Sequence, residues 1–286
     1  MIRAVAPASS ANLGPGFDAA GAALDLWNEL VVEDGEFAVE TEGEGAEEVP
    51  RDASHLALRA FKLFAPLEGR RFSFTSRIPL ERGLGSSAAA IALGLVAGAA
   101  AAGRETTPDE LLGVGWSLEG HADNLAAALN GGVCLTWRRN GAPHAARISE
   151  AMPAAAVVVV PNERTNTTES RSVLPASVPH EDAAYTAGAA ALLGAAVAAG
   201  DPALLSVAFA DRLHEPYRAE STPLLRALQE EPPLDALGVT LSGSGPSVIV
   251  WTSPDDASRV AAELAAAYPD TTVLPLAVAA RGAHLT

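Results

Sequence analysis

The sequence predicts an α+β protein built as one large or two compact domains. Its 286 residues, 49% of them hydrophobic, are enough to bury a sizeable core. The first half of the chain alternates strand and helix signals. The second half runs from an apolar strand through alanine-rich helical segments to further strands. No internal repeat and no long low-complexity linker interrupts it, so two domains would be closely joined.

The elements of the first half follow from hydrophobic spacing and turn residues. A solvated acidic loop at 43–52 precedes the first predicted helix. The pair Asn140–Gly141 is typical of a tight hairpin turn. Thr107, Pro108 and Glu110 form a capping box at a helix start. Predicted strands are 2–7, 29–34, 36–43 and 71–79, predicted helices are 54–67, 86–102, 107–120 and 121–130, and the hairpin spans 133–148.

The second half begins near residue 150, where the apolar run 154–161 restarts the chain as a strand. We therefore expect an N-terminal domain of residues 1–150 and a C-terminal domain of residues 151–286. The remaining elements are predicted in order as two or three alanine-rich helices up to Glu231, a strand–loop–strand at 236–251, a helix at 254–268 and a strand at 271–280.

Charge and cysteine content exclude several classes of function. The net charge of −16 and pI near 4.7 disfavour a nucleic-acid partner, because neutralising phosphates requires clustered Lys and Arg. The same acidity repels an anionic membrane surface. No signal peptide is evident, and the apolar run after Ser87 is too weakly hydrophobic for a membrane span, so a cytoplasmic protein without a membrane partner is expected. Cys134 is the only cysteine, which excludes an internal disulfide and a cysteine metal cluster.

The stretch "PLERGLGSSAAAIALGL" at 79–95 predicts a glycine-rich loop that opens a helix. Unpaired N–H groups and the helix dipole at such an end bind anions without a cationic side chain. No lysine follows the glycines, and Lys62 is the only lysine of the chain. This excludes the P-loop and the protein-kinase designs. If ATP binds here, backbone amides and Mg²⁺ must carry most of the phosphate charge.

Two further glycine-rich turns, at 7–24 and 241–251, would allow a ligand to approach closely. The second lies between two strands and opens no helix, so it is no dinucleotide fingerprint. Any one of the three turns has an ordinary structural explanation. All three together favour a ligand site.

Five segments carry a family resemblance: "SANLGPGFDAAG" (10–21), "PLERGLGSSAAA" (79–90), "EGHADN" (119–124), "HEPYR" (214–218) and "LSGSGPS" (241–247). In this order they resemble the motifs of the GHMP small-molecule kinases and, among these, of the homoserine kinases. The resemblance spans essentially the whole chain. It implies a ribosomal-S5-like N-terminal domain, a ferredoxin-like C-terminal domain and ATP in a phosphate site that is not a P-loop.

The resemblance also implies roles on the nucleotide side. Ser87 and Glu119 match the hydroxyl and carboxylate that hold Mg²⁺, a cation that prefers oxygen ligands and retains several waters. His55 stands where related kinases carry an asparagine that meets the adenine, which puts selectivity for adenine in question. The expected ATP-binding residues are Pro79, Arg82, Gly83, Leu84, Gly85, Ser86, Ser87, Ala88 and Ala89.

On the acceptor side, Arg171 and Arg218 match the pair that would bind the α-carboxylate of L-homoserine through guanidinium forks. Asp18 and Asn124 are the expected catalytic residues, and whether Asp18 is a general base or only orients the substrate stays open. The expected substrate-binding residues are Asn12, Asp18, His121, Thr167, Arg171 and Arg218.

The implied reaction is in-line transfer of the γ-phosphoryl group of MgATP to the side-chain hydroxyl of L-homoserine. Its substrates are small molecules, and a homodimer is plausible from the family. Two alternatives remain: another GHMP kinase acting on shikimate, mevalonate or a sugar, and a non-catalytic metabolite sensor. A sensor would be expected to have lost the magnesium ligands or the acidic residue of the acceptor side, whereas Ser87, Glu119 and Asp18 are all present.

Overall fold

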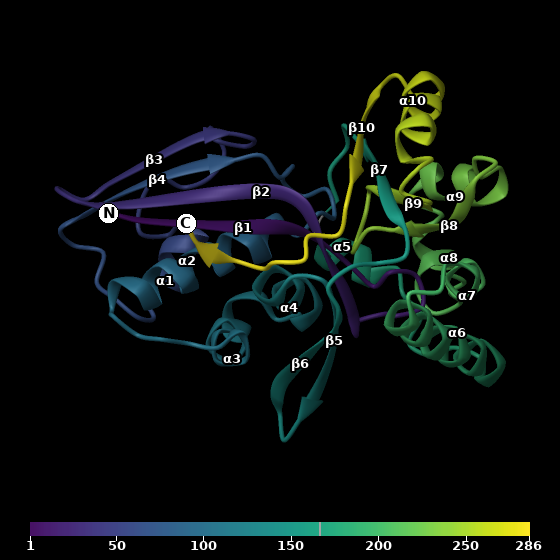
Figure 1. Cartoon of the computed structure of the whole chain (residues 1–286), viewed down its shortest axis with the longest axis horizontal. Coiled ribbons are helices and arrows are strands. Elements are labelled where there is room, and N and C mark those ends of the chain that lie inside the picture. Colours follow the sequence, from purple (N-terminus) through teal and green to yellow (C-terminus); the bar gives the residue numbers. More distant parts are fainter. Residues whose placement is uncertain (166) are drawn as a thin grey trace.

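The fold contains two β-sheets, each covered by helices (Figure 1). The structure is a computed structural model that describes residues 1–165 and 167–286, without the side chains of 167–169. Both chain termini lie beside the first sheet, because the last strand returns to it. The expected α+β arrangement is confirmed.

The first sheet has the order β11-β1-β2-β4-β3, with β5 and β6 attached to one end of β2. All pairs are antiparallel except β3 with β4. The hairpin turn at Asn140 and Gly141 has the predicted conformation, with φ of 52° and 79°. The strands are β1 (Ile2–Ala11), β2 (Ala20–Asp34), β3 (Ala38–Gly43), β4 (Arg70–Ser76), β5 (Val133–Arg139), β6 (Ala142–Ser149) and β11 (His284–Leu285).

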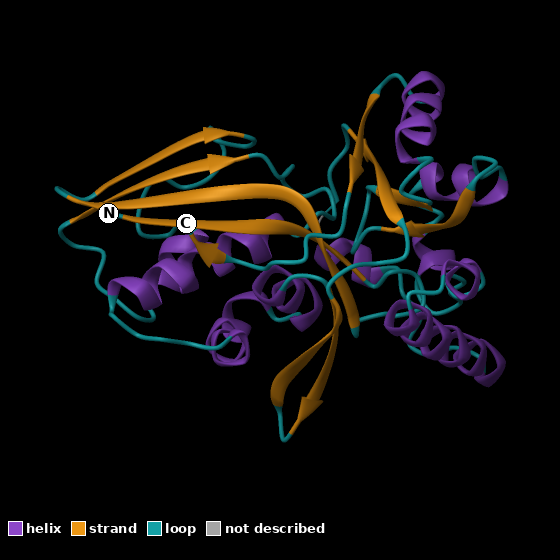
Figure 2. Ribbon diagram, viewed as in Figure 1, coloured by secondary structure: helices purple, strands orange, loops and turns teal. Residues whose placement is uncertain are grey.

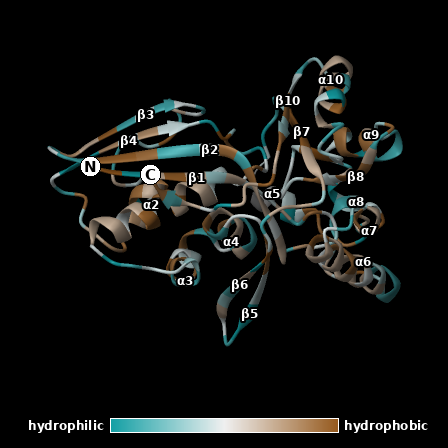
Figure 3. Ribbon diagram, viewed as in Figure 1, coloured by the Kyte–Doolittle hydropathy of each residue, from teal (hydrophilic) through white to brown (hydrophobic). Residues whose placement is uncertain are grey.

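Four helices gather on one side of this sheet (Figure 2). The helices are α1 (Leu56–Phe61), α2 (Ser86–Ala101), α3 (Pro108–Glu119) and α4 (Ala122–Asn130). The capping box at Thr107 is confirmed: its hydroxyl accepts from Glu110 N, and the Glu110 carboxylate accepts from Thr107 N. α2 is buried along most of its length from Ala88 onward, whereas Ser86 and Ser87 at its N-terminus lie at the edge of the core. Figure 3 shows hydrophobic colouring on α2 and a hydrophilic tip on the β5–β6 hairpin.

The second sheet is entirely antiparallel, in the order β10-β7-β9-β8. Every residue of β7 is buried. Its strands are β7 (Ala155–Pro161), β8 (Ala236–Leu241), β9 (Val248–Thr252) and β10 (Thr271–Leu276), and its helices are α5 (Thr167–Ser172), α6 (His180–Ala199), α7 (Pro202–Ser206), α8 (Glu215–Arg218), α9 (Pro223–Glu230) and α10 (Ala257–Ala267).

The prediction of two or three alanine-rich helices before Glu231 was wrong. Five helices occupy that stretch, and only α6 is rich in alanine. Prolines explain the division, because Pro202, Pro216 and Pro223 each lie in the first turn of a new helix. Proline is tolerated there and interrupts a helix elsewhere.

One hydrophobic core extends from the first sheet to the inner face of the second, where Val158 and Trp251 join it. A smaller core lies on the other face of the second sheet, under α9 and α10. The boundary between residues 150 and 151 stays a prediction.

By length and composition, α6 is the one described helix that could cross a membrane. Its residues Thr186, Ala189, Leu193, Ala196 and Val197 are buried in the protein and follow the three-to-four-residue spacing of a core-facing stripe. This spacing is typical of a helix that packs on a folded domain, so α6 is weak evidence for a membrane span.

Candidate active site

The three glycine-rich turns predicted from the sequence meet where the two sheets adjoin. The Ser242 hydroxyl donates to the Gly83 carbonyl at 2.7 Å and lies 2.9 Å from Ser10 Oγ. The amide N–H of Gly243 donates to Ala11 O at 3.1 Å. Asn12 Nδ2 donates to Gly243 O at 2.9 Å. These contacts therefore join the turn at 241–251 to the other two.

The glycine loop adopts a backbone that other residues rarely adopt. Gly83 and Gly85 have φ of 76° and 65°. A Cβ on Gly83 would lie 2.2 Å from Ser242 O, and one on Gly85 would lie 2.0 Å from Ser9 Oγ. Gly85 is the N-cap of α2 and provides no side chain, so the first N–H groups of this helix have no capping partner. They face a cavity of about 260 Å³, which is lined by Gly83, Gly85, Ser86 and Ser87.

The other predicted ATP-binding residues are not part of that cavity wall. Leu84, Ala88 and Ala89 are buried in the core beneath the loop. Arg82 donates through Nε to Pro161 O and through Nη2 to Asn162 O, both at 2.9 Å, so its guanidinium ties the loop to the end of β7. Pro79 lines none of the cavities around the loop.

A second cavity, about 310 Å³ in volume, adjoins the loop and shares Glu81, Ser86 and Ser87 with the first. Its walls are largely apolar and include Phe74. His55 stacks on Phe74 at 4.3 Å between ring centroids and is only 6% exposed. Its Nδ1 accepts from Ala57 N at 3.2 Å, so the ring proton is on Nε2, and burial lowers the pKa of His55.

Ser87 and Glu119 lie side by side, as the resemblance implies. The Ser87 hydroxyl donates to Glu119 Oε2 at 2.9 Å. Burial raises the pKa of Glu119 to about 7, with a further contribution from Asp123 and opposed by the Ser87 bond. Within the described residues no three His, Cys, Asp or Glu side chains converge on a metal site. One hydroxyl and one carboxylate at the wall of a roomy cavity do fit Mg²⁺, which keeps most of its waters.

The largest of these cavities, about 400 Å³, shares Ser87, Glu119 and Asn124 with the glycine-loop cavity. Its wall also contains Asn12, Asp18, His121, Arg171 and Arg218, so the predicted acceptor residues with described side chains converge here. Thr167 begins α5, and its side chain lies outside the described residues.

Asp18 and Arg171 form an ion pair across this cavity. Asp18 has φ of 56°, and its N–H donates to Asn12 Oδ1 at 3.1 Å. Asn12 is thus bonded at both ends of its amide to protein atoms, and its main visible contribution is to shape the loop. The Nε atom of Arg171 is buried and has no hydrogen-bond partner among the described residues.

Two further polar side chains have atoms left free for a ligand. Asn124 Oδ1 accepts from the Ser9 hydroxyl at 2.9 Å, which leaves its amide nitrogen as a donor on the cavity wall. His121 lines the same cavity, and burial together with the nearby charge of Arg171 lowers its pKa. Ser9 carried no signal in the sequence beyond lying in the glycine-rich turn at 7–24.

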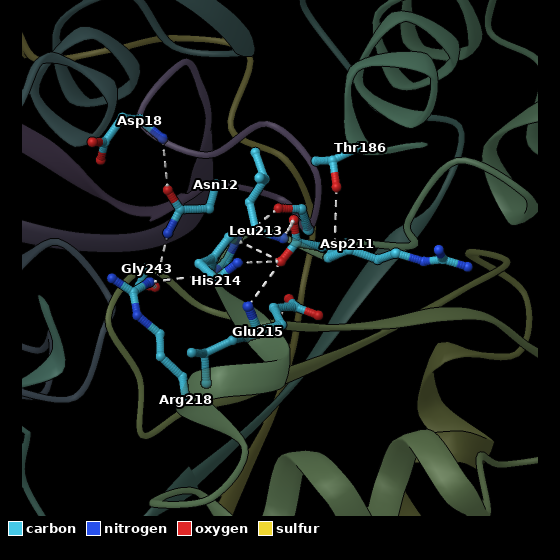
Figure 4. A network of polar contacts seen from close by, with 12 residues as sticks. Asn12, Asp18, Thr186, Asp211, Leu213, His214, Glu215, Arg218 and Gly243 are labelled. Carbon is cyan, nitrogen blue, oxygen red and sulfur yellow. Dashed lines mark hydrogen bonds and ion pairs between the residues drawn. The ribbon is translucent and has the colours of Figure 1, made fainter. Parts of the chain in front are cut away.

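Arg218 is held differently from the expected fork (Figure 4). Its Nε donates to Ser170 O at 3.3 Å, and its Nη1 donates to Gly243 O at 3.1 Å and faces His214 Nδ1 at 3.2 Å. In the part of the chain that the structure describes, these contacts leave only Nη2 for a ligand. The residue is 3% exposed, and burial together with the charge of Arg171 lowers its pKa. His214 was missed by sequence reasoning, although it lies in the "HEPYR" segment.

Comparisons with known proteins show the family of this chain. Residues 53–132 match the model of the GHMP kinases N terminal domain, and residues 189–270 match GHMP kinases C terminal. The homoserine kinase of Streptomyces coelicolor (strain ATCC BAA-471 / A3(2) / M145) is 42% identical over 97% of this chain and 96% of its own.

Solved structures show the same relationship. The homoserine kinase from Cytophaga hutchinsonii ATCC 33406 superposes with a TM-score of 0.85 at 26% identity, covering 100% of this chain and 97% of that one. A mevalonate kinase structure has a TM-score of 0.73 over 97% of this chain and 99% of its own, but at 15% identity it shares the fold alone. The chain is therefore an ATP-dependent kinase of the GHMP family and belongs to its homoserine kinases.

Proposed function

We propose that this chain transfers the γ-phosphoryl group of MgATP to the side-chain hydroxyl of L-homoserine, giving O-phospho-L-homoserine. The observation that carries the proposal is the shared wall of two cavities. Ser87, Glu119 and Asn124 line both the phosphate-loop cavity and the cavity of Arg171 and Arg218. An acceptor hydroxyl and a terminal phosphate would meet at this wall.

On the nucleotide side, the phosphates would bind the free N–H groups at the start of α2. The apolar cavity beside His55 suits the nucleoside. Ser87 and Glu119 would hold Mg²⁺, which supplies charge neutralisation to the phosphate oxygens when bound. The raised pKa of Glu119 supports this role, because a buried carboxylate without a cation partner is the group that a divalent ion would stabilise.

On the acceptor side, the ion pair of Asp18 with Arg171 matches a zwitterion. We expect the substrate carboxylate to bind the guanidinium of Arg171 and Nη2 of Arg218, and the substrate ammonium to bind Asp18. Each charge of the substrate then replaces one partner of the existing pair. Asn124 would donate its amide N–H to the substrate hydroxyl or the transferred group, and His121 and Thr167 would complete the lining.

The chemistry asks mainly for positioning, because phosphoryl transfer passes through a loose transition state. The bond from the γ-phosphorus to ADP breaks as the bond to the substrate oxygen forms, and the hydroxyl proton passes to water. Asp18 is engaged by Arg171 and, in the bound state, by the ammonium. We therefore assign it to orientation of the substrate and not to removal of the hydroxyl proton.

The test is ADP release by the purified protein with MgATP and L-homoserine, compared with shikimate, mevalonate and galactose. Turnover confined to L-homoserine is the expected result. Turnover with another acceptor would keep the kinase and replace the substrate. A folded protein that binds ATP but turns over none of them would favour the sensor alternative.

We further propose a cytoplasmic homodimer that needs neither nucleic acid nor membrane. The net charge of −16 supports the absence of a polyanionic partner. Sedimentation equilibrium across a range of protein concentrations tests the dimer, and a monomer at micromolar concentration would contradict it.

A further inference from the structure

His214 is a buried histidine that the reaction described above does not use. It lies immediately before α8 and is 0% exposed. Its Nε2 lies 2.8 Å from the carbonyl oxygen of Gly14, which can only accept a hydrogen bond. The proton must therefore reside on Nε2, and Nδ1 keeps a lone pair. That lone pair accepts from Nη1 of Arg218 at 3.2 Å.

Asp211 holds the main chain of residues 213–215 in place, and its carboxylate is fully buried. It accepts from the main-chain N–H groups of Leu213, His214 and Glu215 at 2.8 to 2.9 Å. Figure 4 shows this carboxylate beside the turn, with His214 between it and Arg218. The histidine ring is thus anchored independently of Arg218.

Phe17 completes the arrangement from the opposite loop. Its ring stacks on His214 with centroids 4.8 Å apart and an interplanar angle of 23°. The guanidinium carbons of Arg171 and Arg218 each lie 5.5 Å from the Phe17 centroid. The negative π face attracts both cations.

All hydrogen-bond partners of Arg218 among the described residues are neutral: two carbonyl oxygens and one imidazole nitrogen. A buried guanidinium usually has a carboxylate partner, because an unpaired buried charge is costly. A carboxylate here would neutralise Arg218 and compete with an incoming anion. Neutral acceptors fix the direction of the group without a direct carboxylate contact, and the charges of Asp18 and Asp211 act on it only through space.

We infer that His214, supported by Phe17, is a positioning residue that fixes Arg218 with Nη2 toward the acceptor cavity and so sets the affinity for the substrate carboxylate. The inference rests on the proposed function, since it assumes that L-homoserine is the acceptor. It predicts that His214 affects the binding of L-homoserine and not of ATP, and that it does so through the carboxylate of L-homoserine.

Two substitutions test separately the bond of the His214 ring to Gly14 O and its bond to Arg218. In His214→Gln the amide can reach Gly14 O but offers no acceptor to Arg218, whereas in His214→Asn the side-chain oxygen lies near the position of Nδ1. We expect the Gln variant to raise the KM for L-homoserine about tenfold, as loss of one hydrogen bond to a charged group does. Its kcat and its KM for ATP should stay within about twofold, and the Asn variant should restore most of the affinity.

The carboxylate itself is tested with L-homoserine amide, which keeps the hydroxyl and the ammonium. The loss caused by His214→Gln should shrink to about twofold with the amide, because the aligned charge has no anionic partner there. The exposed His180 provides the matched control as His180→Asn, with unchanged constants expected. Thermal unfolding checks that each variant is folded.

Phe17→Leu gives a second route if the histidine variants do not fold, since Phe17 is partly exposed and leucine keeps an apolar side chain. It should raise the KM for L-homoserine about threefold and leave that for ATP unchanged. Equal losses for the acid and the amide, or an equal rise in the KM for ATP, would show a purely structural role and overturn the inference. A wild-type protein inactive with L-homoserine would instead overturn the proposed function first, and this inference with it.

Discussion

Around the glycine loop at 83–85 the site is built from the main chain, whereas around Arg218 it is built from buried side chains. On the nucleotide side, Gly83 and Gly85 make close approaches to Ser242 O and Ser9 Oγ, and the free groups are N–H groups of α2. On the acceptor side, the binding groups are charged side chains, and two main-chain carbonyls and the His214 ring determine which atoms of Arg218 remain free.

The difference corresponds to what each side must recognise. Phosphate is a multiply charged group that many N–H donors can bind, so backbone shape is sufficient and side-chain identity matters little. A small zwitterion is distinguished from other alcohols by one carboxylate and one ammonium, and this requires individual charged side chains in fixed directions. Substitutions should therefore act through sterics on the nucleotide side and through single atoms on the acceptor side.

The largest effect is expected for Gly83→Ala. The new Cβ would meet Ser242 O at 2.2 Å at a φ of 76°, so the loop must move. We expect kcat/KM to fall by roughly a hundredfold or more, since displacements of about 1 Å cost that much. Gly113→Ala is the control, because nothing lies within 4 Å of a Cβ there, and it should keep wild-type rates. Near-normal activity of the Gly83 variant would contradict the main-chain account of this side.

Glu119→Gln changes a residue that lines both the glycine-loop cavity and the acceptor cavity. Loss of the carboxylate should lower kcat about a hundredfold at millimolar Mg²⁺ by weakening charge neutralisation of the phosphates. The Mg²⁺ concentration for half-maximal rate should rise as well. The exposed Glu105→Gln serves as control. Unaltered kcat with unaltered Mg²⁺ dependence would remove Glu119 from the site.

Arg218→Leu tests whether the acceptor side acts alone. We expect the KM for L-homoserine to rise about thirtyfold with little change for ATP, as loss of a charge-assisted hydrogen bond predicts. Arg171→Leu should raise the KM for L-homoserine less, because the Arg171 side chain is 33% exposed and is already paired with Asp18. Steady-state kinetics with each substrate varied in turn measures both. An equal rise of both KM values would identify Arg218 as a folding residue.

Glu215→Gln has the smallest effect and concerns stability. Burial raises the pKa of Glu215 to about 8 in the folded protein, where its oxygens accept from Leu241 N and Gln229 Nε2. Between about pH 5 and 8 the unfolded chain ionises this carboxyl while the folded chain keeps it protonated, so stability falls as pH rises. The variant should lack this fall.

The comparison is made with urea midpoints at pH 5.5 and 8.5. Wild type should lose stability relative to Glu215→Gln on going to the higher pH, and exposed Glu231→Gln should follow wild type. A difference between wild type and the Glu215 variant that does not change with pH would contradict the protonated assignment.

Local sequence was sufficient for much of the fold because short-range rules set it. The capping box at Thr107, the hairpin at Asn140 and the loop into α2 depend on neighbouring residues and appear as predicted. β11 was missed, since two residues contain no periodicity and form a strand only by pairing with β1. The helices of 167–230 are more numerous than predicted because Pro202, Pro216 and Pro223 each begin a new short helix.

For the site, the motifs identified which residues to expect, since each motif is a run of neighbouring residues. They did not indicate which atoms are free. Among the described residues, Ser170, His214 and Gly243 bond to Arg218 and leave only its Nη2 free. Both ends of the Asn12 amide are likewise bonded, one of them to Gly243, which is 231 positions away in the sequence. Neighbouring residues are enough to predict the local elements, the three glycine-rich turns and the paired arginines. The hydrogen-bond partners of these residues follow from the packing of the two sheets, which brings together segments that no local rule connects.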